Sequence, residues 1–325
     1  MLIEKILSLP SPVGDENHLC KISFSGEATP EKTLSIVSGL HGDQLTSLYI
    51  SSCLIRFLET IVLGKNSDFQ LKENVQIFPV VNVNALESGS RHWPYDGLDL
   101  DLAFPGNDCG ETSEKIARAL LSHTADSTLA LMLKTASAHY QDAPHIQCFR
   151  PDRSLKKTAR TLGLAKAKEL EDSSRLKLQL FYQWVISDIP ALIISAGTAG
   201  EINTDYANQI VKGIINLMVQ SGILSANSHS EAETTAPVNF FKSKQEQKIR
   251  NQLPGLFIAH ANVGDNLQEG QKIGEVQDIF SGAIVEEIVA KQAGTLLTLR
   301  RHPLIYENEL IAGLAPEGKT GIWPF

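Results

Sequence analysis

The sequence predicts an α/β domain with a mixed, mostly parallel sheet and helices on both faces, followed by a small all-β, barrel-like domain. In roughly the first two thirds of the 325-residue chain, short runs rich in Val, Ile and Leu alternate with longer segments that carry apolar residues at helical spacing. Beyond residue 254 the helical spacing disappears and glycines separate short β-like runs. Alternation of the first kind is typical of a parallel sheet covered by helices.

The pattern places the elements of the first domain in order. It predicts strands at 20–27 and 32–40, a helix at 47–63, a strand at 75–81, a polar loop through 89–105, a helix at 111–123, a strand at 128–134, a helix at 154–170, a strand at 191–195 and a helix at 203–222. The helix at 47–63 illustrates the argument, because Leu48, Leu54 and Leu58 recur at helical spacing and Gly64 stops it. The run at 75–81 is apolar and rich in β-branched residues, which favours a strand.

Composition divides the chain into three parts. Residues 1–228 are expected to form the α/β domain, 229–249 a linker and 250–325 the β-domain, because 226–235 is rich in Ser, Asn, His, Glu and Thr. Residues 263–276 resemble half of a biotinyl/lipoyl-type barrel. Lys272 and Lys291 do not lie in the exposed Met-Lys-Met hairpin that such carriers modify, so both are interpreted as structural lysines.

The totals describe an ordinary soluble protein, with 42% hydrophobic and 20% charged residues. We expect no membrane span, because no uninterrupted apolar run approaches the roughly 18 residues that one needs, and no export signal. Four scattered cysteines form no CxxC motif, which indicates a reducing, cytoplasmic location. The net charge of -8 argues against nucleic acid as a partner.

The most informative segment is Ser38-Gly39-Leu40-His41-Gly42-Asp43-Gln44, which follows an apolar, β-branched run. A zinc hydrolase needs three protein ligands and an open position for water. It also needs a carboxylate that takes the proton from that water, and cationic groups that hold the substrate. His-x-x-Glu after a strand supplies two ligands, but here the fourth position is an amide, Gln44.

Four segments in this order resemble the succinylglutamate desuccinylase/aspartoacylase family, a branch of the zinc carboxypeptidase fold. The first is residues 38–44, similar to the family's Gly-x-His-Gly-x-Glu. The second runs from Asn82-Val83-Asn84-Ala85 through Arg91 to Asp96-Gly97-Leu98-Asp99-Leu100-Asp101-Leu102-Ala103-Phe104-Pro105-Gly106. The third is Met132-Leu133-Lys134-Thr135, where Asp-Leu-His-Thr is expected. The fourth is residues 189–197, where the family has Pro-x-hydrophobic-x-x-Glu-x-Gly.

The resemblance implies roles for the zinc ligands and the base. His41 corresponds to the first zinc ligand and is retained. Gln44 replaces the ligand Glu, and a neutral amide oxygen is a poor zinc ligand beside a carboxylate. Lys134 replaces the ligand His, and an ammonium there repels a dication. Ser195 replaces the general-base Glu and cannot accept a proton without a partner of its own.

The resemblance also implies roles in substrate binding. Arg91 corresponds to a retained substrate-binding arginine, whereas Asp101 and Leu102 replace the Asn-Arg pair that would bind the substrate carboxylate. The cationic clamp thus becomes anionic and apolar. The paired changes suggest an ion pair between Lys134 and Asp101, in which each charge stabilises the other.

The favoured interpretation is a pseudoenzyme with a degenerate metal site and no cofactor. It would have lost hydrolytic activity and would act by binding or scaffolding. The partners then expected are a small-molecule ligand, a second copy of the chain, or an active deacylase homologue.

Two alternatives remain. The first is a metal-dependent amidohydrolase that deacylates N-acyl amino acids or related small molecules. Its rebuilt zinc site would use His41 and Asp43 together with a displaced ligand, His139 or His145. The second, a serine hydrolase with Ser195 and His41, is disfavoured because the sequence around Ser195 lacks a Gly-x-Ser-x-Gly elbow.

Overall fold

The computed structural model describes residues 1–325 except 11–13, 15, 27–28, 227–236 and 318–325. Its centre is a mixed sheet whose main path runs β1-β2-β5-β3-β6-β9-β7-β17-β19-β12. The strands of the first domain on this path are β1 (Leu2–Pro10), β2 (Glu16–Phe24), β5 (Asn74–Phe78), β3 (Thr33–Val37), β6 (Leu129–Lys134), β9 (Ala191–Gly197) and β7 (Tyr140–Cys148). The central pairs β5–β3, β3–β6 and β6–β9 are parallel. The predicted fold class is confirmed.

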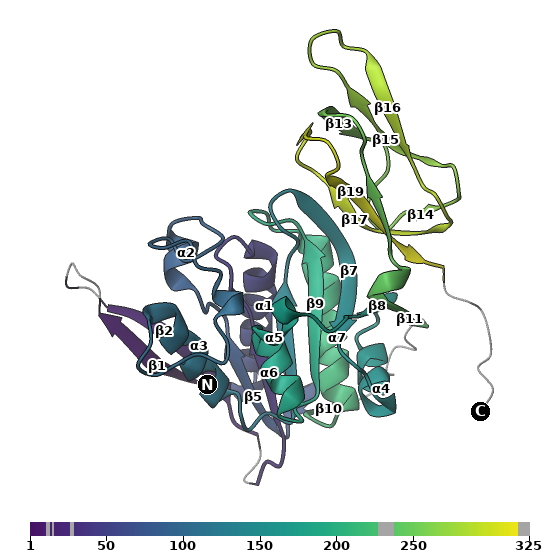
Figure 1. Cartoon of the computed structure of the whole chain (residues 1–325). Coiled ribbons are helices and arrows are strands. Elements are labelled where there is room, and N and C mark those ends of the chain that lie inside the picture. The colour runs from purple at the N-terminus through teal and green to yellow at the C-terminus, as the bar shows by residue number, and fades with distance from the viewer. Residues whose placement is uncertain (11–13, 15, 27–28, 227–236, 318–325) are drawn as a thin grey trace.

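Alternating side chains build one apolar core on each face of this sheet. In β6, Leu131 and Leu133 belong to one core, whereas Ala130 and Met132 belong to the other. The first core is covered by α1 (Leu45–Val62), α4 (Arg153–Thr161) and α7 (Thr204–Gln220). The second is covered by α3 (Thr112–His123), α5 (Ser174–Lys177) and α6 (Leu180–Ile186), so helices lie on both faces (Figure 1).

The carboxyl ends of the parallel strands gather the residues that the sequence singled out. The loop after β3 carries His41, and β6 ends at Lys134. In the β6–β9 ladder Lys134 is the register partner of Ser195. Both continue the alternating series that faces the second core, so their side chains leave the same face of the sheet. In open α/β sheets this edge is where ligands bind.

Several predicted elements differ from the structure. The helix expected at 154–170 ends at Thr161, because Gly163 turns the chain with φ 66° and β8 (Lys166–Glu169) follows. β1 and β7 were missed. β7 begins with the polar residues Tyr-Gln-Asp, so it has no continuous apolar run by which the strand could be predicted. A short helix, α2 (Val83–Glu87), and a 3₁₀ turn, η1 (Leu100–Leu102), lie in the long loop after β5.

The C-terminal strands continue the main sheet. β17 (Gly294–Arg300) pairs with β7, and β19 (Leu310–Pro316) and β12 (Gln247–Arg250) follow it outward. β14 (Asn266–Leu267) pairs with β17. A second sheet projects from the body in the order β16 (Ile284–Val289), β15 (Lys272–Gln277), β13 (Gly255–Ala259) and β18 (Leu304–Ile305), as Figure 1 shows. One apolar core is shared by this second sheet and by β12, β14, β17 and β19.

The segment expected as a linker, 229–249, is partly structured. Residues 229–236 lie outside the described residues, but β11 (Asn239–Lys242) pairs with β8, and a 3₁₀ turn (Ser243–Gln245) leads into β12. β10 (Leu224–Ala226) is the last element before residues 227–236, and it pairs with β4 (Phe69–Leu71) in a small separate sheet. The division at 228 and 250 remains a prediction. Lys272 is ion-paired with Glu275 and Glu287, in keeping with a structural role.

Helix α1 is long and apolar enough, by length and composition, to cross a membrane. Ile50, Leu54 and Leu58 are buried against the sheet, so the core accounts for the apolar character of this helix. All four cysteines are free, which confirms the expectation that they form no disulfide framework.

Gly42 provides a test of how tightly the His41 loop is held. A Cβ built on this glycine would overlap the backbone of Ala85 in α2. We therefore expect Gly42→Ala to lower the free energy of unfolding by about 1–3 kcal/mol, as overpacking of a dense site does. Urea denaturation followed by circular dichroism measures this change. A loss within about 0.5 kcal/mol, the range of an ordinary surface change, would contradict the close approach of the two segments.

Candidate functional site

The site is organised around the imidazole of His41, which is 3% exposed. Its Nε2 lies 2.7 Å from Asp99 Oδ1, and its Nδ1 lies 3.0 Å from Gln44 Nε2. Gln44 occupies the N-cap position of α1 but makes no capping bond with its side chain. In this arrangement Nε2–H donates to Asp99, and the amide of Gln44 donates to Nδ1. Both nitrogens of the ring are therefore engaged by protein groups.

Asp99 is the anionic centre of the cluster. Besides the bond from His41, it accepts one from Arg175 NH2 at 2.9 Å and one from the backbone N–H of Asp101 at 3.2 Å. His92 Nε2 lies 3.8 Å from Asp99 Oδ2. Burial by itself would raise the pKa of this carboxyl. The hydrogen bond from His41 and the nearby charges of His41, His92 and Arg175 outweigh burial and hold the pKa of Asp99 well below its usual value.

Lys134 and Asp101 form the ion pair that the sequence suggested. Lys134 Nζ donates to Asp101 Oδ2 at 2.7 Å, and the two side chains are 15% and 4% exposed. This part of the prediction is confirmed. Because the carboxylate is almost completely buried, the ammonium is the charge that compensates it.

The residues present do not fit a zinc ion at the position that the family resemblance implies. A ligand there would be His41 Nδ1, but Gln44 directs its amide nitrogen at that atom. Gln44 Oε1 has no hydrogen-bond partner among the described residues. The third ligand position holds an ammonium committed to Asp101. The set of donors that zinc needs, deprotonated and facing one point, is not assembled at that place.

Ser195 meets a carboxylate that the sequence analysis missed. Its Oγ donates to Asp142 Oδ2 at 2.9 Å, and Thr298 Oγ1 donates to Asp142 Oδ1 at 2.6 Å. Asp142 is 8% exposed and lies on β7. These bonds join β9, β7 and β17. Since β7 was not recognised in the sequence, no signal placed Asp142 beside Ser195.

Arg91 and Asp43 pair with one another. Arg91 NH1 lies 3.5 Å from Asp43 Oδ2, and the two side chains are 31% and 11% exposed. Asp43 Oδ1 and Arg91 NH1 make no hydrogen bond among the described residues. Leu102 is half-buried in η1. The guanidinium expected to hold a substrate carboxylate thus faces a carboxylate of the protein itself.

Neither loop histidine of the alternative metal site is placed with His41 as a possible ligand group. His139 packs edge-on against His302, with ring centroids 4.8 Å apart. His145 is fully buried, its Nδ1 donates to the carbonyl of Ala143, and its Nε2 accepts from Gln147. Burial lowers the pKa of His145. His145 lies within β7 instead of the expected loop, and among the described residues it belongs to no group of ligand atoms with His41.

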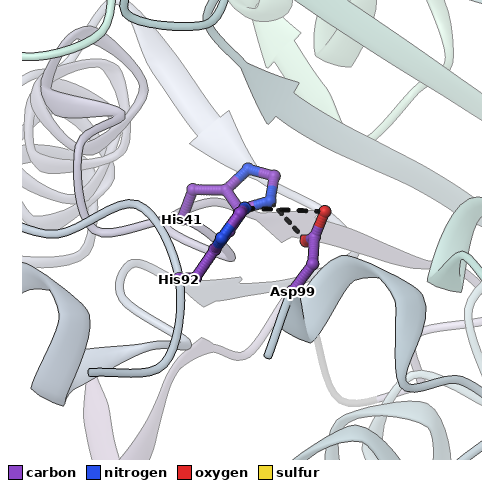
Figure 2. A group of neighbouring side chains, drawn as sticks. All are labelled: His41, His92 and Asp99. Atoms are coloured by element: carbon purple, nitrogen blue, oxygen red, sulfur yellow. Dashed lines mark hydrogen bonds and ion pairs between the residues drawn. The ribbon is translucent and has the colours of Figure 1, made fainter. Parts of the chain in front are cut away.

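A different group has the composition of a metal site, and Figure 2 shows it. Among the described residues, His41, His92 and Asp99 offer ligand atoms that all lie within 4.8 Å of one another. The sequence analysis named neither His92 nor Asp99 as a candidate. Asp99 was visible in the Asp-Gly-x-Asp segment, but nothing in the sequence placed His92 beside it.

The Lys134–Asp101 pair can be tested by a double-mutant cycle. Lys134→Met leaves a buried carboxylate without its cation, so we expect a loss of about 3–5 kcal/mol in the free energy of unfolding. Lys134→Met combined with Asp101→Asn removes both charges and is expected to recover most of that loss. Urea denaturation of the wild type, both single variants and the double variant gives the coupling energy. Additive single effects would show that the two groups do not interact.

No family model matches the chain. Among curated proteins, N-alpha-acetyl-L-2,4-diaminobutyric acid deacetylase of Halomonas elongata is 23% identical over 302 residues, which cover 87% of this chain and 82% of that protein. This similarity is spread over both parts of the chain.

Solved structures superpose over nearly the whole chain. A succinylglutamate desuccinylase/aspartoacylase from Rhodobacter sphaeroides has a TM-score of 0.77 at 18% identity, covering 94% of this chain and 92% of that one. The ectoine utilization protein EutE of Ruegeria pomeroyi, solved with product bound, has a TM-score of 0.75 at 17% identity, covering 95% and 93%. The resemblance predicted from the sequence motifs is thus supported by both kinds of comparison, and the chain has the succinylglutamate desuccinylase/aspartoacylase fold.

Proposed function

We propose that this chain is a deacylase-like pseudoenzyme, which has lost the zinc ion at the inherited position and with it the hydrolytic activity. The observation that carries the proposal is the Lys134–Asp101 ion pair, 2.7 Å long, with the carboxylate almost fully buried. An ammonium held at a former ligand position repels a dication. Its own counter-charge is already within the protein, so a zinc ion would have to break the pair in order to bind.

The loss of the general base supports the same proposal. Zinc hydrolases take a proton from the metal-bound water with a carboxylate. Ser195 stands at that position, and its hydroxyl is a donor to Asp142. Asp142 in turn accepts from Thr298 on its other oxygen. Each oxygen of this carboxylate therefore accepts a hydrogen bond from a hydroxyl of the protein.

A binding or scaffolding role follows. The small-molecule ligand, a second copy of the chain and an active deacylase homologue remain the proposed partners, in the cytoplasm. The guanidinium of Arg91 now faces Asp43. The same group could bind the carboxylate of a ligand. An anionic ligand would replace that contact, which at 3.5 Å is longer than a normal charge-assisted hydrogen bond.

The second candidate is a metal-dependent deacylase of N-acyl amino acids. It is favoured by the names of the similar proteins, which are deacetylases and desuccinylases, and by the His41, His92 and Asp99 group. It requires a base within reach of the metal-bound water. A positioned base of this kind contributes about 10²–10⁴-fold to the rate, and Ser195 does not supply it.

Restoring the inherited residues distinguishes the two. The variant Gln44→Glu/Asp101→Asn/Lys134→His/Ser195→Glu returns both ligands and the base, and removes the carboxylate that Lys134 would leave unpaired. With zinc supplied, we expect it to hydrolyse N-acetyl amino acids at least about 10²-fold faster than the wild type. The same variant with His41→Ala is the matched control and should stay inactive.

The wild type, tested in parallel with zinc, is expected to show no hydrolysis above the uncatalysed rate. Zinc-dependent turnover by the wild type that is abolished by a chelator would overturn the pseudoenzyme proposal. A folded but inactive restored variant would instead show that the four positions do not correspond to the inherited site.

A further inference from the structure

We propose that the chain binds one divalent transition-metal ion on Nε2 of His41, the nitrogen opposite to the inherited zinc ligand, with His92 and Asp99 as the other protein ligands. The proposal rests on the proposed function in one respect, that Nδ1 of His41 holds no metal. Zinc, cobalt and nickel are the ions that suit two imidazoles and one carboxylate. A fourth position would remain open to water.

The geometry of the three side chains carries the proposal. Figure 2 shows His41 and His92 converging with Asp99 on a common space. His41 Nε2 lies 2.7 Å from Asp99 Oδ1, and His92 Nε2 lies 3.8 Å from Asp99 Oδ2. Ligand atoms about 2.0–2.1 Å from a tetrahedral zinc ion lie roughly 3.3 Å from each other. The two observed separations bracket that value, and all three ligand atoms lie within 4.8 Å of one another.

The exchange that binding requires balances simply. Without metal, the proton on His41 Nε2 is shared with Asp99 Oδ1 through their hydrogen bond. The metal takes the place of that proton, which passes through solvent to Nδ1 of the same ring, so that the neutral imidazole and the carboxylate both become ligands.

Gln44 gives an independent observation in favour of the site. Its Oε1 is buried and has no hydrogen-bond partner among the described residues, while its Nε2 faces His41 Nδ1. An imidazole that binds metal through Nε2 carries its proton on Nδ1. Rotating the Gln44 amide by half a turn would place Oε1 where it accepts that proton, because the two ends of an amide have the same shape. Such outer contacts fix the tautomer and orientation of a ligand histidine.

Arg175 is the group that opposes binding. Its NH2 donates to Asp99 Oδ2 at 2.9 Å, and it would repel a dication held by the same carboxylate. The side chain is 65% exposed and projects from the short helix α5. It can therefore turn into solvent when the metal arrives. Because Arg175 already places a positive charge beside Asp99, we expect its removal to strengthen metal binding. Substitution of any of the three ligands is expected to weaken it.

The experiment is a titration of the full chain, stripped with EDTA and dialysed, with Co²⁺ followed by visible absorption and with Zn²⁺ followed by calorimetry. We expect one ion per chain in the wild type. His92→Ala and Asp99→Asn should each weaken binding more than 100-fold, and Gln44→Leu about 10–100-fold, the range for outer contacts. Arg175→Gln should tighten binding. His139→Ala, which removes another exposed histidine, is the matched control and should bind as the wild type does.

The outcomes separate this proposal from the preceding one. Absence of saturable binding in both the wild type and Arg175→Gln would overturn the metal site and leave the pseudoenzyme proposal intact. Binding that is unaffected by His92→Ala but lost in Gln44→Leu would place the metal on Nδ1 and contradict both. Hydrolysis is measured separately and plays no part in this test.

Discussion

The ion pair between Lys134 and Asp101 is the contact on which the arrangement of the edge depends. Asp101 comes from the turn that follows Asp99, and Lys134 ends β6, the strand beside Ser195. A single salt bridge therefore ties the loop after β5 to the middle of the sheet. A carboxylate buried to this degree is tolerated only with a cation beside it. That requirement fixes where the turn lies, and with it the position of Asp99 relative to His41.

The same edge of the sheet carries several pairs of opposite charge. His41 with Asp99, Lys134 with Asp101, Arg91 with Asp43 and Arg175 with Asp99 are all oppositely charged or chargeable pairs. Each carboxylate of this group meets a cationic or imidazole group of the protein. In a site that binds a divalent metal and a substrate carboxylate, these two charges from solution compensate the charged side chains of the protein. Here the side chains supply much of that compensation internally.

The sequence was sufficient for the fold class and for most elements of the first domain, whereas the roles assigned to the ligand and base positions stay predictions. Apolar periodicity located α1, α3, α7 and the central strands, because these elements bury one continuous face. The Lys134–Asp101 contact followed from two coupled substitutions. The predicted end of the helix at 154–170 is wrong, because the chain turns at Gly163 and α4 ends before it.

What the sequence could not supply were partners from segments without a helical or strand pattern. His92 lies in a loop, Arg175 in a four-residue helix, and Asp142 in a strand whose first residues are polar. Arg175 lies 76 residues from Asp99 in the sequence and Asp142 lies 53 residues from Ser195, so tertiary folding brings each of these pairs together. No local rule addresses contacts of that kind.

The pairing of β17 with β7 has a consequence for how the molecule holds together. Thr298 contributes a hydroxyl to Asp142, and β17 protects the outer edge of β7. A chain cut near residue 250 would leave β7 with open backbone groups and Asp142 with one fewer donor. The amino-terminal part thus depends on β17 for some of its hydrogen bonds. In such a fragment the exposed edge of β7 would be open to pairing with a strand of another molecule.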